Sequence, residues 1–283
     1  MTDARAVLKR TGLAPKKSFG QNFLVSPHTV EAIADACVPE RERGRARVLE
    51  LGAGTGALTR ALVVRARSVV AVERDRDLVP VLEEELASLD LPEGRVRVVE
   101  GDAQVVEPRA LLGDADADSP RVLCGNLPYQ ITGRLLERAV AHADDLERVV
   151  FMVQLEVADR LAADPGSKTY GGLTVFTRAA FRTRKLFAVG PGSFHPPPDV
   201  TSAVIMMEPE RPRRAAETDV FRALVKGAFG MRRKTLRNAW KSVAPAEQIA
   251  AAAATAGISL EARGETLDVD QFAAMARALS DQA

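Results

Sequence analysis

Short apolar runs alternate with helical patterns through the first half of the chain. Residues 47–59, RVLELGAGTGALT, predict a buried strand, a glycine-rich turn and the start of a helix. Four more apolar runs predict strands at 68–75, 95–103, 121–126 and 148–154. Apolar helical patterns lie between them, so the chain predicts an α/β fold with a parallel sheet and helices on both faces.

Beyond the fifth run the periodicity weakens. Residues 155–163 have a helical pattern, and 164–172, DPGSKTYGG, have the composition of a loop. Residues 190–200 contain three consecutive prolines, which remove three backbone donors, so we expect no regular structure there. Residues 201–208, TSAVIMME, predict a final strand.

A charged, proline-containing stretch at 208–218 has the character of a linker, and residues 219–283 are helical in pattern and rich in alanine. We therefore predict two domains, at 1–210 and 211–283, the first of which opens with a basic segment over residues 1–24.

The composition is that of a soluble globular protein, with 46% apolar and 27% charged residues among 283. No apolar run is long enough to span a membrane, and the N-terminus lacks a signal peptide's apolar core. We expect a cytoplasmic protein without membrane contact. Two cysteines and three scattered histidines predict neither a disulfide scaffold nor a metal site.

Positive charge is concentrated in two places although the net charge is only +1. The N-terminal segment holds five basic residues before position 18 against the single Asp3. The other place is an acid-free stretch with seven basic residues: Arg222, Lys226, Arg232, Arg233, Lys234, Arg237 and Lys241. Two such patches on a nearly neutral body favour contact with a polyanion, and the alternative is an ordinary solvated helix face.

The glycine-rich turn fits a dinucleotide or nucleoside cofactor. Gly52 to Ala57 match the G-x-G-x-x-G/A pattern, and Glu73 follows Gly52 by 21 residues, the spacing of an acid that binds a ribose. A nicotinamide-dependent dehydrogenase and an S-adenosylmethionine (SAM)-dependent methyltransferase fit equally well at this point. Asp102 after the third strand slightly favours the methyltransferase because it could accept from an adenine amine, but it could also be a helix N-cap.

The sequence Asn-Leu-Pro-Tyr, residues 126–129, ends the fourth predicted strand. Methyl transfer to an exocyclic amine needs two acceptors that hold both N–H groups and turn the nitrogen lone pair toward the methyl donor. The Asn126 side-chain oxygen and a backbone carbonyl of Leu127 or Pro128 could be these acceptors, and the Tyr129 ring could stack on the base. The other interpretation is a plain strand-to-helix turn.

In these motifs and in others along the sequence, the chain resembles the KsgA/RsmA family of small-subunit ribosomal RNA adenine dimethyltransferases. The resemblance covers most of the chain. Its motifs follow in the family's order: KKSFGQNFL (16–24), LELGAGTGALT, VERD, GDA, NLPY, VQLEVADRL, SKTYGGLTV, FHPPPDVTSAV, RRKTLRN (232–238) and ARGETLDVDQFAAMAR (262–277).

The resemblance implies a class I SAM-dependent methyltransferase, with a Rossmann-like, seven-stranded, mostly parallel sheet and a small all-α C-terminal domain that binds rRNA. It implies that SAM is the cofactor and that two adjacent adenines in the 3′-terminal hairpin loop of 16S rRNA become N6,N6-dimethyladenine. The partner would be the small ribosomal subunit before its assembly is complete, and we expect a monomer.

The resemblance also implies roles for single residues. Asn126, Leu127, Pro128, Tyr129 and Phe194 would form the catalytic site, with Tyr129 and Phe194 on either side of a flipped adenine. The cofactor would contact Asn22, Leu24, Gly52, Gly54, Glu73, Asp102 and Asn126. The RNA would contact Arg232, Arg233, Lys234 and Arg237.

Four positions depart from the family pattern, which often has Pro at Ala53, Asn at Gln130 and Lys at Leu155 and Asp199. The last two remove positive charge near the expected RNA face. Two rival functions stay open: an Erm-type enzyme that methylates an adenine of large-subunit rRNA, and a ribosome-assembly factor whose binding matters more than catalysis. The stretch at 126–129, together with the basic C-terminal region, argues against a dehydrogenase.

Overall fold

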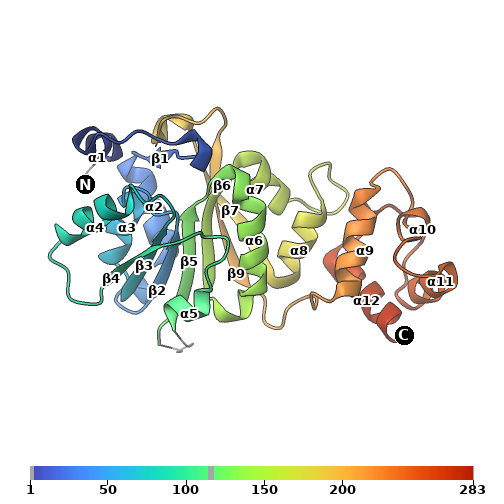
Figure 1. Cartoon of the computed structure of the whole chain (residues 1–283). Helices are drawn as coiled ribbons and strands as arrows, with labels where there is room; N and C mark the ends of the chain where they lie inside the picture. The colour runs from blue at the N-terminus through green and yellow to red at the C-terminus, as the bar shows by residue number, and fades with distance from the viewer. Residues whose placement is uncertain (1–2, 114–117, 283) are drawn as a thin grey trace. The chain divides into compact units, whose positions relative to one another are not determined.

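The computed structural model describes residues 3–113 and 118–282, and its internal contacts divide the chain into two compact units (Figure 1). Unit 1 comprises Met1–Ala158 and Arg184–Glu208, and unit 2 comprises Asp159–Thr183 and Pro209–Ala283. The predicted domain boundary at 210/211 lies near the third crossing between the units, at 208/209. Residues 159–183, however, cluster with the C-terminal unit, whereas the sequence had assigned them to the first domain.

Unit 1 is built on a seven-stranded sheet. In spatial order its strands are β4 (Val96–Glu100), β3 (Ser68–Glu73), β2 (Arg47–Leu51), β5 (Arg121–Asn126), β6 (Arg148–Gln154), β9 (Ser202–Pro209) and β7 (Phe181–Val189). The pairs from β4 to β6 are parallel, and β9 pairs antiparallel with β6. The predicted mostly parallel sheet is confirmed, and the five apolar runs form its five parallel strands.

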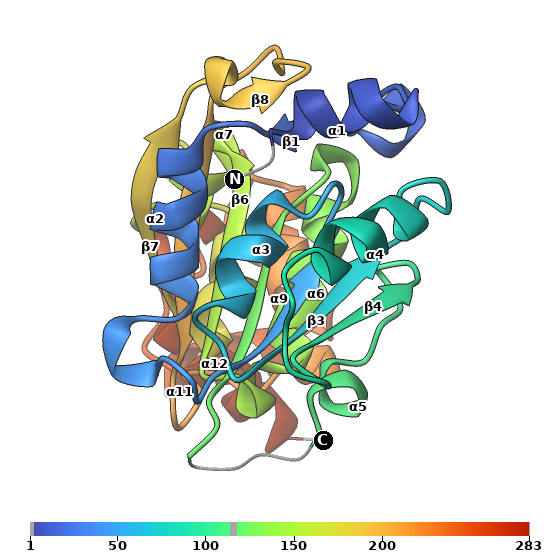
Figure 2. The same ribbon diagram turned by 90° about the vertical axis from the view of Figure 1, so that its left-hand side faces the viewer.

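Helices cover both faces of this sheet. Those of unit 1 are α2 (Pro27–Cys37), α3 (Ala57–Val63), α4 (Val79–Ala87), α5 (Pro108–Leu112) and α6 (Thr132–Ala141). Helix α7 (Leu155–Leu161) follows β6 and contains the 158/159 boundary between the units. Figure 2 shows α2, α3 and α4 on one face and α6 on the other. Val48, Cys124 and Val150 are fully buried in one cluster with α2 and α3, which explains why the strands read as continuous apolar runs. Short 3₁₀ turns connect these elements: η2 (Glu40–Glu42), η3 (Tyr129–Ile131) and η4 (Ala143–Asp145).

The N-terminal segment crosses the end of the sheet where the parallel strands finish. It contains α1 (Ala4–Thr11), η1 (Lys17–Phe19) and β1 (Phe23–Leu24) (Figures 1 and 2). Strand β1 pairs antiparallel with β8 (Phe194–His195), which follows η5 (Pro191–Ser193). The expectation of no regular structure at 190–200 was therefore wrong for its first half, because the three prolines begin only at Pro196, after β8.

Unit 2 is helical. It contains α8 (Gly172–Ala180), α9 (Asp219–Gly230), α10 (Leu236–Ala239), α11 (Ala246–Thr255), η6 (Gly264–Thr266) and α12 (Val269–Ser280). Its core holds the fully buried rings of Tyr170, Phe221, Trp240 and Phe272. The Tyr170 hydroxyl donates to the Leu267 carbonyl at 2.9 Å, so residues 159–183 complete the core of the C-terminal unit.

Neither a membrane-spanning helix nor a cluster of metal ligands is found among the described residues. No helix between residues 3 and 113 or 118 and 282 is long and apolar enough to cross a membrane. Within the same ranges, no group of three or more His, Cys, Asp or Glu side chains could hold a metal ion.

Candidate active site

A cavity opens at the carboxyl ends of the parallel strands, where ligands bind in sheets of this kind. We call it the main cavity. Four segments supply most of its wall: Ser18–Leu24 of the N-terminal segment, 50–58 around the glycine turn, 101–103 after β4, and 126–131 after β5. The end of β3 completes the wall with Glu73. Segments far apart in the sequence therefore meet in one place.

The glycine turn connects β2 to α3 along one side of this cavity. Gly52 and Gly54 have φ of 74° and 59°, in the left-handed region that favours glycine. A Cβ on Gly54 would lie only 3.0 Å from the Phe23 ring, so the turn also needs glycine for space. Both glycines predicted to contact a cofactor line the main cavity.

Glu73, at the end of β3, is held rigidly by the backbone. Its Oε2 accepts from the Gly54 N–H and its Oε1 from the Asp75 N–H, both at 2.8 Å. The side chain lines the main cavity and is mostly buried. Burial raises the pKa of Glu73, while these backbone donors oppose the rise because they stabilise the ionised form.

Asp102 also lines the main cavity, and it stabilises its own turn. Its Oδ1 accepts from the Gln104 N–H at 2.9 Å, and its Oδ2 lies 3.5 Å from the Arg74 guanidinium. The two interpretations of Asp102, a turn-capping residue and a cavity residue, are thus compatible with each other.

The N-terminal segment is tied to the catalytic stretch through Asn126. The Nδ2 of Asn126 donates to the Asn22 carbonyl at 2.8 Å, and Asn22 and Leu24 both line the main cavity. Because Nδ2 already donates to the Asn22 carbonyl, the side-chain oxygen of Asn126 is the atom of this amide that can accept a hydrogen bond from a ligand.

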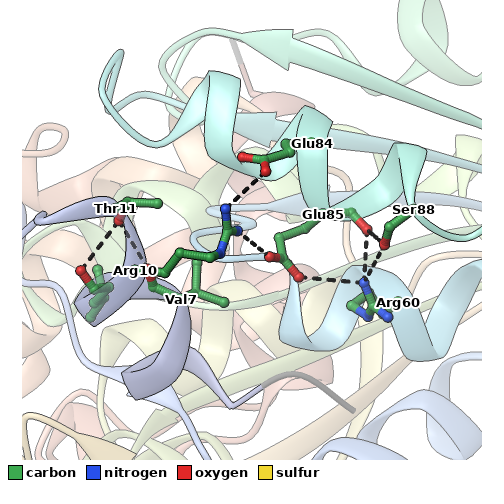
Figure 3. A network of polar contacts seen from close by, with 8 residues as sticks. Val7, Arg10, Thr11, Arg60, Glu84, Glu85 and Ser88 are labelled. Carbon is green, nitrogen blue, oxygen red and sulfur yellow. Dashed lines mark hydrogen bonds and ion pairs between the residues drawn. The ribbon is translucent and has the colours of Figure 1, made fainter.

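Ion pairs connect the same segment to the loop after β3 and to α4. The Lys16 ammonium contacts Asp75 at 2.5 Å and Asp77 at 2.6 Å, and the Gln21 amide donates to Asp75 at 2.7 Å. Farther out, Arg10 on α1 pairs with Glu84 and Glu85 on α4 at 2.8 and 2.6 Å (Figure 3). Two basic residues predicted to belong to a polyanion patch therefore have acidic partners within the chain.

The stretch 126–129 begins where β5 meets β2 most closely. A Cβ on Gly125 would lie 2.4 Å from the Leu51 carbonyl oxygen, so only glycine fits before Asn126. The Pro128 carbonyl accepts from the Ile131 N–H at 3.2 Å and the Thr132 hydroxyl at 3.1 Å. The Leu127 carbonyl accepts no such bond from the described residues. Of the two carbonyls that the sequence left open, Leu127 is the one available to a ligand.

The two aromatic rings differ in their surroundings. Tyr129 lines the main cavity, and its hydroxyl lies 2.8 Å from the Ser202 hydroxyl. Phe194 is only 2% exposed and packs in the same core cluster as Leu24 of β1, and it is not among the residues that line the cavity. The structure therefore brings Asn126, Leu127, Pro128 and Tyr129 to the cavity but places Phe194 beside it.

The four predicted RNA-binding residues lie on the surface of unit 2: Arg232, Arg233 and Lys234 in the turn after α9, and Arg237 in α10. Arg232 donates to the Lys168 carbonyl at 3.1 Å and pairs with Glu265 at 3.2 Å, and Arg237 pairs with Glu261 at 2.8 Å. The side chains of Arg233 and Lys234 are exposed and have no ion pair with the described residues.

Phe19, Gln21 and Glu50 are among the wall residues that sequence reasoning missed. Glu50 carried a usable signal, because it is the one charged side chain inside the apolar run VLEL. An acid at a buried position of a central strand is rare without a functional or structural reason.

A glycine turn after the first sheet strand, an acid after the next and an Asn-Leu-Pro-Tyr stretch at one cavity define a class I methyltransferase. The profile of the family described as ribosomal RNA adenine dimethylase matches residues 12–281. The chain belongs to this family.

The names of similar proteins are consistent with this family. The chain is 44% identical to ribosomal RNA small subunit methyltransferase A of Geobacter metallireducens, over 96% of this chain and 98% of the relative. It is 42% identical to the protein of that name from Myxococcus xanthus, over 99% and 96%.

Two solved structures have the same fold. A dimethyladenosine transferase from Plasmodium falciparum has a TM-score of 0.77 at 24% identity, covering 89% of this chain and 95% of that chain. The 23S rRNA methyltransferase ErmE has a TM-score of 0.68 at 26% identity, covering 92% and 100%.

Proposed function

We propose that this protein transfers methyl groups from SAM to the N6 amines of two adjacent adenines in small-subunit rRNA, giving N6,N6-dimethyladenine. One observation carries the proposal: the Asn126–Tyr129 stretch and the glycine turn line a single cavity. The names of the 42–44% identical relatives support the small subunit as the substrate rather than the large subunit.

The main cavity suits a cofactor with positive charge. Its wall carries three carboxyl groups, those of Glu50, Glu73 and Asp102, against one basic side chain, that of Arg74, and the backbone of the glycine turn is open to close approach. SAM would supply an electrophilic methyl group on a cationic sulfur. Gly52, Gly54, Asn22 and Leu24 would enclose the cofactor, Glu73 would accept from its ribose, and Asp102 would accept from its adenine amine.

The target amine would be held by two acceptors, the Asn126 side-chain oxygen and the Leu127 carbonyl. The lone pair of this amine is conjugated with the purine ring, so the nitrogen is a weak nucleophile. Two fixed acceptors hold its hydrogens and favour a pyramidal nitrogen, and no strong base is needed because the proton leaves after the nitrogen becomes cationic. Catalysis would come from positioning and preorganised electrostatics. One N–H remains after the first transfer, which permits the second.

The rings would hold the flipped base. Tyr129 faces the main cavity and would stack on the adenine, an interaction worth about 1–3 kcal/mol. For Phe194 to cover the opposite face of the base, its side chain must leave the core cluster that it shares with Leu24. We therefore assign Phe194 a position in the substrate complex that differs from its position here.

The test uses radiolabelled SAM with unmethylated small and large ribosomal subunits in separate reactions, followed by mapping of the labelled nucleotides. We expect label on two adjacent adenines of the small-subunit rRNA, and mass spectrometry of the digest should give dimethyladenosine. Label on the large subunit would support the Erm-type alternative. Tight subunit binding without label would support a pure assembly factor, and monomethyladenosine alone would contradict dimethylation.

A further inference from the structure

Ser202 is a polar side chain in a buried, apolar run. It is the first residue of β9, whose first six residues, SAVIMM, are all buried, and it is 0% exposed. A buried hydroxyl is costly unless it forms a hydrogen bond. The Ser202 hydroxyl lies 2.8 Å from the Tyr129 hydroxyl, and neither hydroxyl has another hydrogen bond with the described residues. The tyrosine at the main cavity is therefore the polar partner that this position of β9 requires.

The backbone holds Ser202 firmly in place. Strand β9 runs antiparallel to β6, and Ser202 pairs with Gln154, the last residue of β6. Next to it, the Thr201 carbonyl accepts from the Leu155 N–H at 2.9 Å. Ser202 is not among the described residues that line the main cavity. It can therefore act on a ligand in this cavity only through Tyr129.

The hydrogen bond fixes the far end of the Tyr129 side chain. The near end belongs to the first residue of η3, three positions after Asn126. Strand β6 lies between the two attachment points, because β5 pairs with one edge of β6 and β9 with the other. A tyrosine side chain has two rotatable bonds before the hydroxyl, and a fixed hydroxyl restricts both. The tilt of the ring is thus set by the protein before a ligand binds.

We propose that Ser202 is a positioning residue for methyl transfer, which holds the Tyr129 ring at the tilt that the reaction requires. The inference rests on the proposed function, in which the target adenine stacks on this ring. A stacked base follows the plane of the ring, so a change of tilt moves the amine at the edge of the base away from the Asn126 oxygen and the Leu127 carbonyl. A misplacement of about 1 Å can lower a rate by about 100-fold. The ring face itself remains, so the rate should suffer more than the binding of the base.

Single-turnover methylation of unmethylated small subunits by the full chain tests this role. We would compare the wild type, Ser202→Ala, Tyr129→Phe and the double variant at saturating SAM, and vary the enzyme concentration to obtain the maximal rate and the half-saturating concentration. Each single variant removes the same hydrogen bond and keeps an aromatic ring. We therefore expect each to lower the maximal rate by about three- to tenfold, the range for one neutral hydrogen bond. The double variant should lose no more than either single variant, because the bond is removed only once.

The half-saturating concentration and the Kd for SAM should stay within about twofold of the wild type, since neither the ring face nor the cofactor site is altered. The matched control is Ser119→Ala. Ser119 is 1% exposed, and its hydroxyl accepts from the Arg67 guanidinium at 2.9 Å, just before β5 and thus at the end of this strand opposite Asn126. This variant loses a buried, hydrogen-bonded hydroxyl from the same unit, so it should lower the Tm as Ser202→Ala does but keep the wild-type rate.

The outcomes separate this inference from the function on which it rests. A wild-type rate for Ser202→Ala would overturn the role of Ser202, as would a loss in the double variant equal to the product of the two single losses. A loss confined to Tyr129→Phe would assign the tyrosine hydroxyl to the substrate and would also overturn that role. In all these cases the wild type still labels two adjacent adenines, so the proposed function stands. A wild type that labels neither ribosomal subunit would overturn the function and this inference together.

Discussion

Asn126 uses the two ends of one amide for two different purposes. Its nitrogen donates to the Asn22 carbonyl at 2.8 Å, which holds the N-terminal segment, and its oxygen is the proposed acceptor for the target amine. Both ends matter, so a substitution at this position should affect binding and catalysis to different extents.

We predict that Asn126→Ala lowers the methylation rate at saturating SAM by about 100-fold or more, the usual loss when one preorganised polar group is removed. The Kd for SAM should rise by no more than about tenfold, since one neutral hydrogen bond contributes about 0.5–1.5 kcal/mol. Single-turnover kinetics together with calorimetry separate the two effects. A variant that kept the full rate would refute the acceptor role.

Glu50 should make the stability of the ligand-free protein depend on pH. Its pKa is about 8 in the folded state and close to 4.5 in the unfolded chain. The folded state therefore binds the extra proton between these values, and this contribution to stability is full below about pH 4.5 and is lost as the pH rises through 8. Glu50→Gln should remove this loss of stability at high pH, because a Gln side chain does not ionise. The Tm of the variant should therefore exceed that of the wild type by several degrees near pH 8.5 and match it near pH 5. Scanning calorimetry at both pH values checks this, and an equal difference at the two would contradict it.

At the scale of elements, the N-terminal segment is a wall of the main cavity rather than a free basic arm. Residues 18–24 line the cavity, and Lys16 and Gln21 attach them to Asp75. Asp75 and Asp77 raise the pKa of Lys16 by accepting from its ammonium. The N-terminal segment is therefore held by the ion pairs of Lys16 and by the pairing of β1 with β8.

We predict that Lys16→Met weakens SAM binding by about three- to tenfold, because the ion pairs with Asp75 and Asp77 are lost and the wall becomes less ordered without them. The effect should shrink in high salt, which screens the wild-type pair. Lys17→Met is the matched control, since Lys17 is exposed and no hydrogen bond or ion pair of its side chain to the described residues is found. Equal losses for the two variants would show that net charge, not this contact, is responsible.

At the scale of the whole molecule, the acid-free stretch 222–241 does not act as one uniform patch. Arg222, Arg232 and Arg237 pair with acids elsewhere in unit 2, whereas Arg233 and Lys234 are exposed without such partners in the described chain. The charge available to a phosphate backbone is therefore concentrated in the turn after α9.

We predict that Arg233→Glu with Lys234→Glu weakens binding to the small subunit and lowers the slope of log K against log salt by about 1.4–1.8, which corresponds to the loss of two phosphate contacts. Arg41→Glu with Arg45→Glu changes the charge equally at two exposed residues before β2 and should leave the slope near that of the wild type. Filter binding at several salt concentrations measures both variants, and an unchanged slope for the first would remove these residues from the RNA interface.

The sequence by itself determined the sheet and most of the cavity wall. Buried parallel strands must be apolar along their whole length, so β2 to β6 were visible as runs, and the turns that follow them carry chemistry that only certain residues supply. It could not reveal β7, a strand at the edge of the sheet, whose charged and half-buried residues leave no clear apolar run.

Only the tertiary structure decided which groups meet. It showed that the Pro128 carbonyl accepts hydrogen bonds while the Leu127 carbonyl accepts none from the described residues, that Phe194 is buried, and that Lys16 has acidic partners in the loop between β3 and α4. It also assigned residues 159–183 to the C-terminal unit. A hydrogen bond or an ion pair depends on two groups that are 59 or 104 residues apart in the chain, as for Lys16 with Asp75 and Asn22 with Asn126. Local sequence patterns do not show such pairs, because only the folded backbone brings the two groups within hydrogen-bonding distance of each other.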